Sequence, residues 1–220
     1  MRNERSVSAE TAVTGLGCQY GTFCLAGAKV HPMPTVIGRA SEARSRLLRT
    51  ASEIFYSQGI HDIGVDRILE EASVTRSTFY RHFPSKEDLV LAYVQATDGA
   101  VRATWAGAKQ SVADPREQLR ALAGLMSTQI CRPGFRGCAF INAAAEYPDP
   151  KNPVHRAVLD HRAWLRQTVT DAFAEAGHPD PERAGRHFIM LRDGAMVAGY
   201  LNDPTQSRQT LEEGVEALLP

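Results

Sequence analysis

The feature that most constrains the fold is a pair of short helical segments joined by a tight turn. The first, VDRILEEAS, places Val65 and Ile68 on one face at helical spacing. The second can be capped by Thr75, and it ends before Pro84 because proline disfavours helical geometry in the residue that precedes it. Two short helices, a tight turn and a polar second helix together predict a helix-turn-helix.

The polar second helix lies in the stretch TRSTFYRHFPSKEDL, and its composition predicts contact with DNA. A core helix would carry Leu and Ala, and a solvated helix would carry Glu, but this one carries hydroxyls, aromatic rings and arginines. Arg76 is suited to bidentate reading of guanine, whereas the hydroxyls, His82 and Lys86 suit phosphate oxygens. The predicted DNA contacts are Arg44, Thr75, Arg76, Ser77, Thr78, Tyr80, Arg81, His82 and Lys86.

Overall charge favours no particular partner, because 25 Lys and Arg residues balance 25 Asp and Glu residues. The segment from Arg39 to Gln95 is also neutral, with eight basic and eight acidic side chains. DNA affinity must therefore depend on the arrangement of the charges, and we expect it to fall with salt. Without the motif, these arginines would be read as ordinary solvated side chains.

The rest of the chain predicts an all-α protein of about nine helices, without strand alternation or an internal repeat. The helix before the motif begins near Ser41 and stops at Gly59. Later helices share one start signal, an acid or amide cap followed by proline in the first turn. These starts are Asp114-Pro115, Asn152-Pro153, Asp180-Pro181 and Asp203-Pro204.

Three segments are predicted. Residues 1–40 have no helical or strand period and are interpreted as a disordered arm that contains Cys18, Cys24 and a possible alternative start at Met33. Residues 41–94 form the helix-turn-helix domain, and residues 95–220 form a second helical domain. With neither a membrane-spanning run nor a signal-peptide pattern in the sequence, we expect a cytoplasmic protein without membrane partners.

The stretch from about Ala43 to Val94 resembles the DNA-binding domain of the tetracycline-repressor (TetR) family of bacterial regulators. The family pattern V-[ST]-x-x-[ST]-[FL]-Y-x-H-F-x-[SN]-K-E-x-L is matched at Val74, Thr75, Thr78, Phe79, Tyr80, His82, Phe83, Ser85, Lys86, Glu87 and Leu89. The chain departs from the family at Gly64, where Thr or Ser usually caps the second helix, and at Ser73, which replaces the common turn glycine.

The resemblance implies a homodimer that binds a palindromic DNA operator, with a C-terminal domain that dimerises and binds an unknown small-molecule effector. It favours a repressor that the effector releases from DNA. The alternative is a ligand-binding dimer whose DNA binding is conditional or of the activator type.

The segment RGCAFINAAAEYPDP places polar and small side chains along one helical face and predicts part of an effector pocket. Its Asn and Glu could instead satisfy neighbouring backbone or Arg groups, and its cysteine could be a redox or electrophile sensor. With one aromatic residue of a later helix, the predicted pocket residues are Cys138, Asn142, Glu146 and Trp164.

The segment LRDGAMVAGYL carries a strip of small residues that would let another helix approach closely. Since the last two helices of this family usually form a four-helix bundle with their symmetry mates, the resemblance places the dimer interface on residues 181–202 and 204–219. Packing within one chain is the alternative. The interface residues are Gly194, Ala195, Ala198 and Gly199.

No pattern in the sequence predicts catalysis or a bound cofactor. His155 and His161 are six residues apart, so they do not share a helical face as metal ligands would. Neither a nucleophile triad nor a phosphate-binding glycine loop stands out. We therefore expect neither an enzyme nor a metal site.

Overall fold

A computed structural model describes residues 39–220, and within this range every regular element is a helix. The prediction of an all-α chain with about nine helices is confirmed for these residues. Cys18, Cys24, Met33 and nearly all of the predicted arm lie outside the described residues. The helices are α1 (Arg39–Gln58), α2 (Val65–Ala72), α3 (Arg76–His82), α4 (Lys86–Ser111), α5 (Pro115–Ile130), α6 (Ala139–Glu146), α7 (Pro153–Glu175), α8 (Pro181–Leu201) and α9 (Pro204–Leu218).

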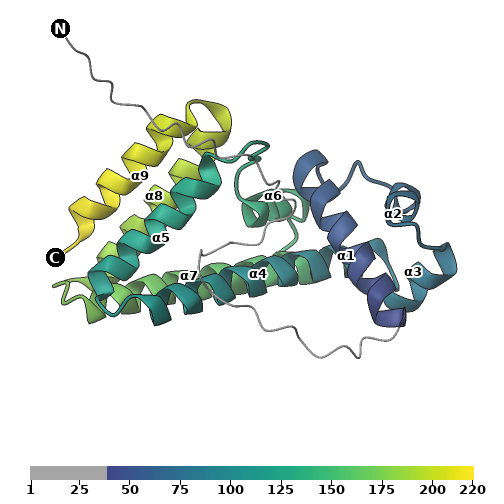
Figure 1. The fold of residues 1–220 in the computed structure, drawn as a ribbon, viewed down its shortest axis with the longest axis horizontal. Coiled ribbons are helices and arrows are strands. Elements are labelled where there is room, and N and C mark those ends of the chain that lie inside the picture. Colours follow the sequence, from purple (N-terminus) through teal and green to yellow (C-terminus); the bar gives the residue numbers. More distant parts are fainter. Residues whose placement is uncertain (1–38) are drawn as a thin grey trace, which may run out of the picture. The chain divides into compact units, whose positions relative to one another are not determined.

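Helices α1, α2 and α3 pack together around apolar side chains of all three (Figure 1). Leu47 of α1, Ile68 of α2 and Phe79 of α3 are fully buried. α1 starts at Arg39, two residues before the predicted start, so Ser41 lies inside the helix rather than at its cap. The apolar faces of the two short helices α2 and α3 thus pack against α1 and produce the predicted helix-turn-helix.

The turn between α2 and α3 requires a left-handed residue, and Ser73 occupies that position with φ 51° and ψ 50°. Its backbone N–H donates to Glu70 O, and the Val74 N–H donates to Leu69 O at 3.0 Å, so two carbonyls in the last turn of α2 are satisfied. Glycine would adopt this conformation with less strain than serine. The departure from the family at this position therefore keeps the turn geometry at a small cost.

The predicted helix caps are confirmed where local chemistry determines them. The Thr75 side chain accepts from Thr78 N at the start of α3, and the Ser85 side chain accepts from Asp88 N at the start of α4. Gly64 provides no side-chain cap for α2, as its lack of a side chain predicts. The four acid or amide caps before proline all accept backbone N–H groups; they are Asp114, Asn152, Asp180 and Asp203.

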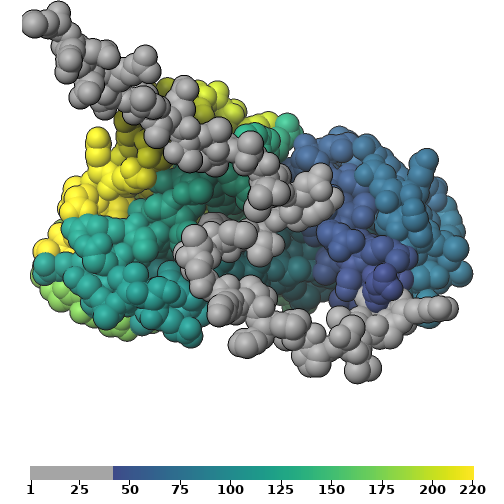
Figure 2. Space-filling view, in the orientation of Figure 1, coloured from purple at the N-terminus to yellow at the C-terminus, as the bar shows by residue number. Residues whose placement is uncertain are grey.

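Helix α4 is continuous from Lys86 to Ser111, so it crosses the predicted domain boundary between residues 94 and 95. The first part of α4 packs on α1, and its later part packs on α7 (Figure 1). α5, α7, α8 and α9 pack against one another, and the fully buried rings of Phe173 on α7 and Phe188 on α8 meet edge-on with 6.4 Å between centroids. The yellow surface of α9 lies against the teal surface of α5 in Figure 2. Among the described residues, no helix has the length and apolar character needed to cross a membrane.

Candidate DNA-binding site

The N-terminal turn of α3 presents a small group of hydroxyls at the surface. Thr75 Oγ1 donates to Thr78 Oγ1 at 3.0 Å and lies 3.2 Å from Ser77 Oγ. Thr75 and Ser77 are exposed and Thr78 is half-buried. Hydroxyls and backbone N–H groups at a helix start are suited to phosphate oxygens, because the positive end of the helix dipole lies there.

The opposite face of α3 is anchored in the core by Phe79 and Phe83, whose ring centroids are 6.1 Å apart. The Tyr80 ring meets the Phe79 ring edge-on with 5.1 Å between centroids. Tyr80 nevertheless remains 45% exposed, and its hydroxyl makes no hydrogen bond within residues 39–220. A fixed ring with an unpaired hydroxyl can therefore donate to an outside acceptor without breaking an internal contact.

Arg76 is exposed at the first position of α3, and its guanidinium pairs with the Asp66 carboxylate of α2. Both side chains are largely solvated, so the pair is worth at most about 1 kcal/mol. Arg76 can exchange this partner for a base edge at little cost. The aspartate thus orients the guanidinium in the free protein.

The remaining predicted contacts surround α3 but differ in exposure. The exposed Arg44 guanidinium lies 5.0 Å from the Phe83 ring centroid, and Arg81 is exposed on α3. His82 is half-buried, and its Nε2 is buried without a hydrogen-bond partner among the described residues. That nitrogen is not presented to solvent, so the predicted phosphate contact of His82 has no support from its placement.

Lys86, the first residue of α4, faces the turn after α1 rather than open solvent. Its Nζ donates to His61 O at 3.2 Å. Partial burial lowers the pKa of Lys86, and the nearby carboxylates of Glu146 and Asp62 oppose this effect. The ammonium group is therefore held at the turn after α1 by a backbone carbonyl, which a phosphate could replace.

The four predicted pocket residues lie in different surroundings. Cys138 caps α6 and its Sγ lies 3.1 Å from Nη2 of the buried Arg192. Asn142 is exposed and donates to Arg136 O at 2.8 Å. The Arg102 guanidinium lies over the Trp164 ring, with 4.4 Å between Arg102 Cζ and the ring centroid.

Glu146, the fourth pocket candidate, is directed toward the α1–α2 turn, where it accepts hydrogen bonds from Ile60 and His61. For Asn142 and Glu146, the alternative that they satisfy neighbouring groups agrees with the geometry. The effector pocket stays a prediction. No local sequence signal identifies the Glu146 contact, because its partners are 85 and 86 residues away.

A partly buried polar cluster that the sequence did not predict joins α4, α6 and α7. His161 is 2% exposed, stacks on Phe140 with 3.5 Å between ring centroids, and donates from Nδ1 to Asp98 Oδ1 at 2.7 Å. Arg102 donates to the same carboxylate at 2.7 Å. Burial would raise the pKa of Asp98, but these hydrogen bonds outweigh it and lower the pKa. The cluster therefore holds the Asp98 carboxylate in its ionised form among the C-terminal helices.

The predicted interface strip divides between two environments. Gly199 packs inside the chain, because an added Cβ would lie 2.4 Å from Ile130 Cγ2. Gly194 faces open space and lines, with Ala195 and Ala198, a groove of about 570 Å³ between α8 and α9. Packing within the chain thus explains Gly199, whereas the other three predicted residues line an open groove.

Comparison with known proteins identifies relatives over the helix-turn-helix and over most of the chain. The model for bacterial regulatory proteins of the tetR family matches residues 47–93. Transcriptional regulator AcuR of Cereibacter sphaeroides is 31% identical over 184 residues, which cover 76% of this chain and 82% of AcuR. The transcriptional activator FasR of Mycolicibacterium smegmatis is 38% identical over 80 residues, which cover 36% of each protein.

The fold is also shared with a solved relative of higher identity. The crystal structure of SCO4454, a TetR-family transcriptional regulator from Streptomyces coelicolor, superposes with a TM-score of 0.79 at 54% identity. The match covers 81% of this chain and 94% of SCO4454. The similarity therefore extends beyond α1–α3 into the C-terminal helices.

Proposed function

Because this chain belongs to the tetR family of bacterial regulatory proteins and is a DNA-binding transcriptional regulator, we propose that it is a homodimeric repressor released from a palindromic operator by a small molecule. The observation that carries the proposal is the exposed polar face of α3, which stands on the buried Phe79 and Phe83. In a regulator of bacterial transcription, this face would meet DNA in the cytoplasm.

In the proposed complex, α3 enters the major groove and its N-terminal residues face the base edges. Arg76 leaves Asp66 to donate two hydrogen bonds to guanine. Thr75, Thr78 and Tyr80 contact phosphate oxygens, which fixes the position of α3 on the duplex. Arg44, Ser77, Arg81 and Lys86 are assigned to the same surface, whereas His82 would need to turn its ring.

The proposed dimer forms through α8 and α9. Their surface exposes large apolar side chains, with Met190 74% and Leu201 67% exposed in one chain. Next to them lies the groove lined by Gly194, Ala195 and Ala198, whose small side chains admit a helix at short distance. A second copy of the same chain would bury both features, and it would place two α3 helices about 34–36 Å apart in successive major grooves.

Effector release requires a ligand that binds the non-DNA-binding conformation more tightly than the DNA-binding one. The proposed ligand enters among α4, α6, α7 and α8, and it shifts α4, which begins directly after α3 in the chain. An activator is the second candidate, because the relative FasR is a transcriptional activator. Ligand would then recruit the protein to DNA rather than release it.

Fluorescence anisotropy tests the proposal, with the DNA upstream of the chain's own gene at two salt concentrations and a scrambled duplex of equal length as control. We expect tight, sequence-selective binding that weakens as salt rises. Selectivity that appears only after a ligand is added would favour the activator. Equal affinity for both duplexes, with and without candidate ligands, would contradict operator recognition at this DNA.

A further inference from the structure

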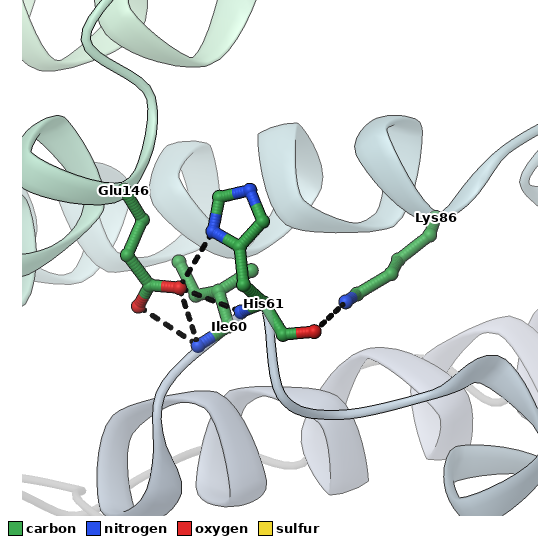
Figure 3. A network of polar contacts seen from close by, with 4 residues as sticks. All are labelled: Ile60, His61, Lys86 and Glu146. Atoms are coloured by element: carbon green, nitrogen blue, oxygen red, sulfur yellow. Dashed lines mark hydrogen bonds and ion pairs between the residues drawn. The ribbon is translucent and has the colours of Figure 1, made fainter.

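The carboxylate of Glu146, the last residue of α6, binds the turn that follows α1. Its Oε1 accepts from Ile60 N at 2.8 Å, and its Oε2 accepts from His61 N at 2.6 Å and from His61 Nδ1 at 2.9 Å. Figure 3 shows these bonds converging on one carboxylate, with Lys86 on the far side of the same turn. A single side chain of the C-terminal helices thus holds two successive backbone N–H groups of the DNA-binding unit (α1–α3).

The turn is shaped to receive an anion. Gly59 has φ +94°, a left-handed conformation that ends α1 and is followed at once by the two N–H groups that face Glu146. Burial would raise the pKa of Glu146, but the hydrogen bonds from Ile60 and His61 outweigh it and lower the pKa. The carboxylate is therefore ionised at neutral pH.

A second tie joins α1 to the other end of α6. The Tyr56 hydroxyl donates to Gly137 O at 3.0 Å and accepts from Arg136 N at 3.0 Å. Gly137 lies one residue before the Cys138 cap of α6, and Glu146 is the last residue of α6. Both ends of α6 are thus hydrogen-bonded to the C-terminal part of α1 or to the turn after it.

We propose that Glu146 and Tyr56 are positioning residues for operator binding. They fix the DNA-binding unit relative to the helices that carry the α8–α9 groove, and so they set the separation of the two α3 helices in a dimer. A dimer with fixed units is preorganised for one half-site spacing, whereas a dimer with loose units must be ordered on binding and tolerates several spacings. This inference rests on the proposed function.

The inference is tested with a palindrome that the wild-type protein selects from a random duplex pool, and with versions that have one base pair inserted or deleted between the half-sites. Each change rotates one half-site by about a tenth of a turn. We define the spacing penalty as the Kd on the altered operator divided by the Kd on the selected one. Glu146→Gln removes the charge and replaces one of the two acceptor oxygens with a donor NH2 group, so one of the backbone N–H groups loses its acceptor.

We expect Glu146→Gln to weaken binding to the selected operator about tenfold, as the loss of one charge-assisted hydrogen bond implies, and to lower the spacing penalty several-fold. Asp62→Asn is the matched control, since it removes an exposed negative charge from the same turn without breaking a hydrogen bond among the described residues. It is expected to keep the wild-type spacing penalty. Circular dichroism at the assay temperature confirms that each variant is folded.

Tyr56→Phe removes the second tie and tests the inference independently of charge. Like Glu146→Gln, Tyr56→Phe is expected to lower the spacing penalty. A wild-type spacing penalty in both folded variants, or equal weakening on all spacings, would overturn the inference and leave the proposed function standing. If the wild-type protein selects no palindrome, the proposed function itself fails.

Discussion

Arg192 and Asp193 are adjacent in the sequence and form an ion pair inside the C-terminal helices, with Arg192 Nη1 donating to Asp193 Oδ1 at 2.7 Å. Arg192 is only 7% exposed, and Asp193 also accepts from Arg162 Nη2 at 2.6 Å. One carboxylate therefore serves two guanidinium groups. Removal of the Asp193 carboxylate would lower the free energy of unfolding by more than the ion pair itself contributes, because the buried Arg192 charge is then left uncompensated.

Asp193→Asn is therefore predicted to lower the free energy of unfolding by about 3–5 kcal/mol, since it leaves Arg192 buried without its carboxylate. Arg162→Gln is the matched comparison. It removes the more exposed guanidinium while Arg192 still pairs with Asp193, so the expected loss is about 1 kcal/mol or less. Urea unfolding of both variants measures the difference. Equal losses would mean that the Arg192 charge is compensated by another group.

A second prediction concerns the pH dependence of stability through His161. Burial lowers the pKa of His161, Asp98 opposes this effect, and the charges of Arg192 and Arg102 add to it. The folded protein thus binds this proton less readily than the unfolded chain, in which the pKa is about 6.5. The stability associated with neutral His161 is complete above that value and is lost as the pH falls through it toward the lower folded pKa.

Unfolding free energies measured over a pH series check this prediction. Wild-type stability is expected to fall between about pH 7.5 and pH 5.5, and His161→Gln is expected to flatten that part of the curve. The informative quantity is the change in slope, because the substitution also lowers stability at every pH. Parallel curves for the two proteins would show that His161 does not titrate differently in the folded state.

The sequence predicted those parts of the structure that depend on neighbouring residues. Thr75, Ser85 and the caps before proline bind N–H groups two or three residues away, so the local sequence pattern is enough to predict them. The hydrogen bond from His61 N to Glu146 spans 85 positions, and the contact of Arg192 with Cys138 spans 54. Such pairs depend on how helices pack, and no spacing rule reveals them.

The small-residue strip illustrates the same limit. Gly194 and Gly199 carry the same side chain on one helix, yet one faces open space and the other contacts Ile130. The sequence showed that another helix could approach this strip closely. Which glycine meets a neighbour of the same chain depended on the placement of α5.

The third prediction isolates the Tyr80 hydroxyl. Tyr80→Phe is expected to weaken operator binding by about 1.5–3 kcal/mol if the hydroxyl donates to a phosphate. The stability should stay at the wild-type value, because the hydroxyl has no internal partner among the described residues. The salt dependence should also be unchanged, since the lost group is neutral. Anisotropy titrations at several salt concentrations, together with a thermal melt, check all three outcomes.

The fourth prediction separates base reading from phosphate contact at Arg76. Arg76→Ala is expected to reduce discrimination at one base pair of each half-site by about 1–3 kcal/mol. Titration of the wild type and the variant against a panel of single-base operator changes locates that position. If Arg76→Ala weakens every sequence equally, Arg76 contacts phosphate and another side chain reads the base. Asp66→Asn should preserve the discrimination, because Asp66 only orients the free guanidinium.

The last prediction concerns dimerisation through the α8–α9 surface. Met190→Asp places a charge where the proposed dimer buries an apolar side chain that is 74% exposed in one chain, so it should weaken association by about 3–5 kcal/mol or more. Leu159→Asp is the matched control, because Leu159 is 48% exposed on α7 and does not line the groove. It should remain dimeric.

Sedimentation velocity over a range of protein concentrations measures this difference. The monomeric Met190→Asp variant should also lose most of its operator affinity, because one DNA-binding unit no longer raises the effective concentration of the other. A Met190→Asp variant that sediments as a dimer, or a Leu159→Asp variant that dissociates, would place the interface on another face. In either case the exposed apolar side chains of α8 would need a different partner.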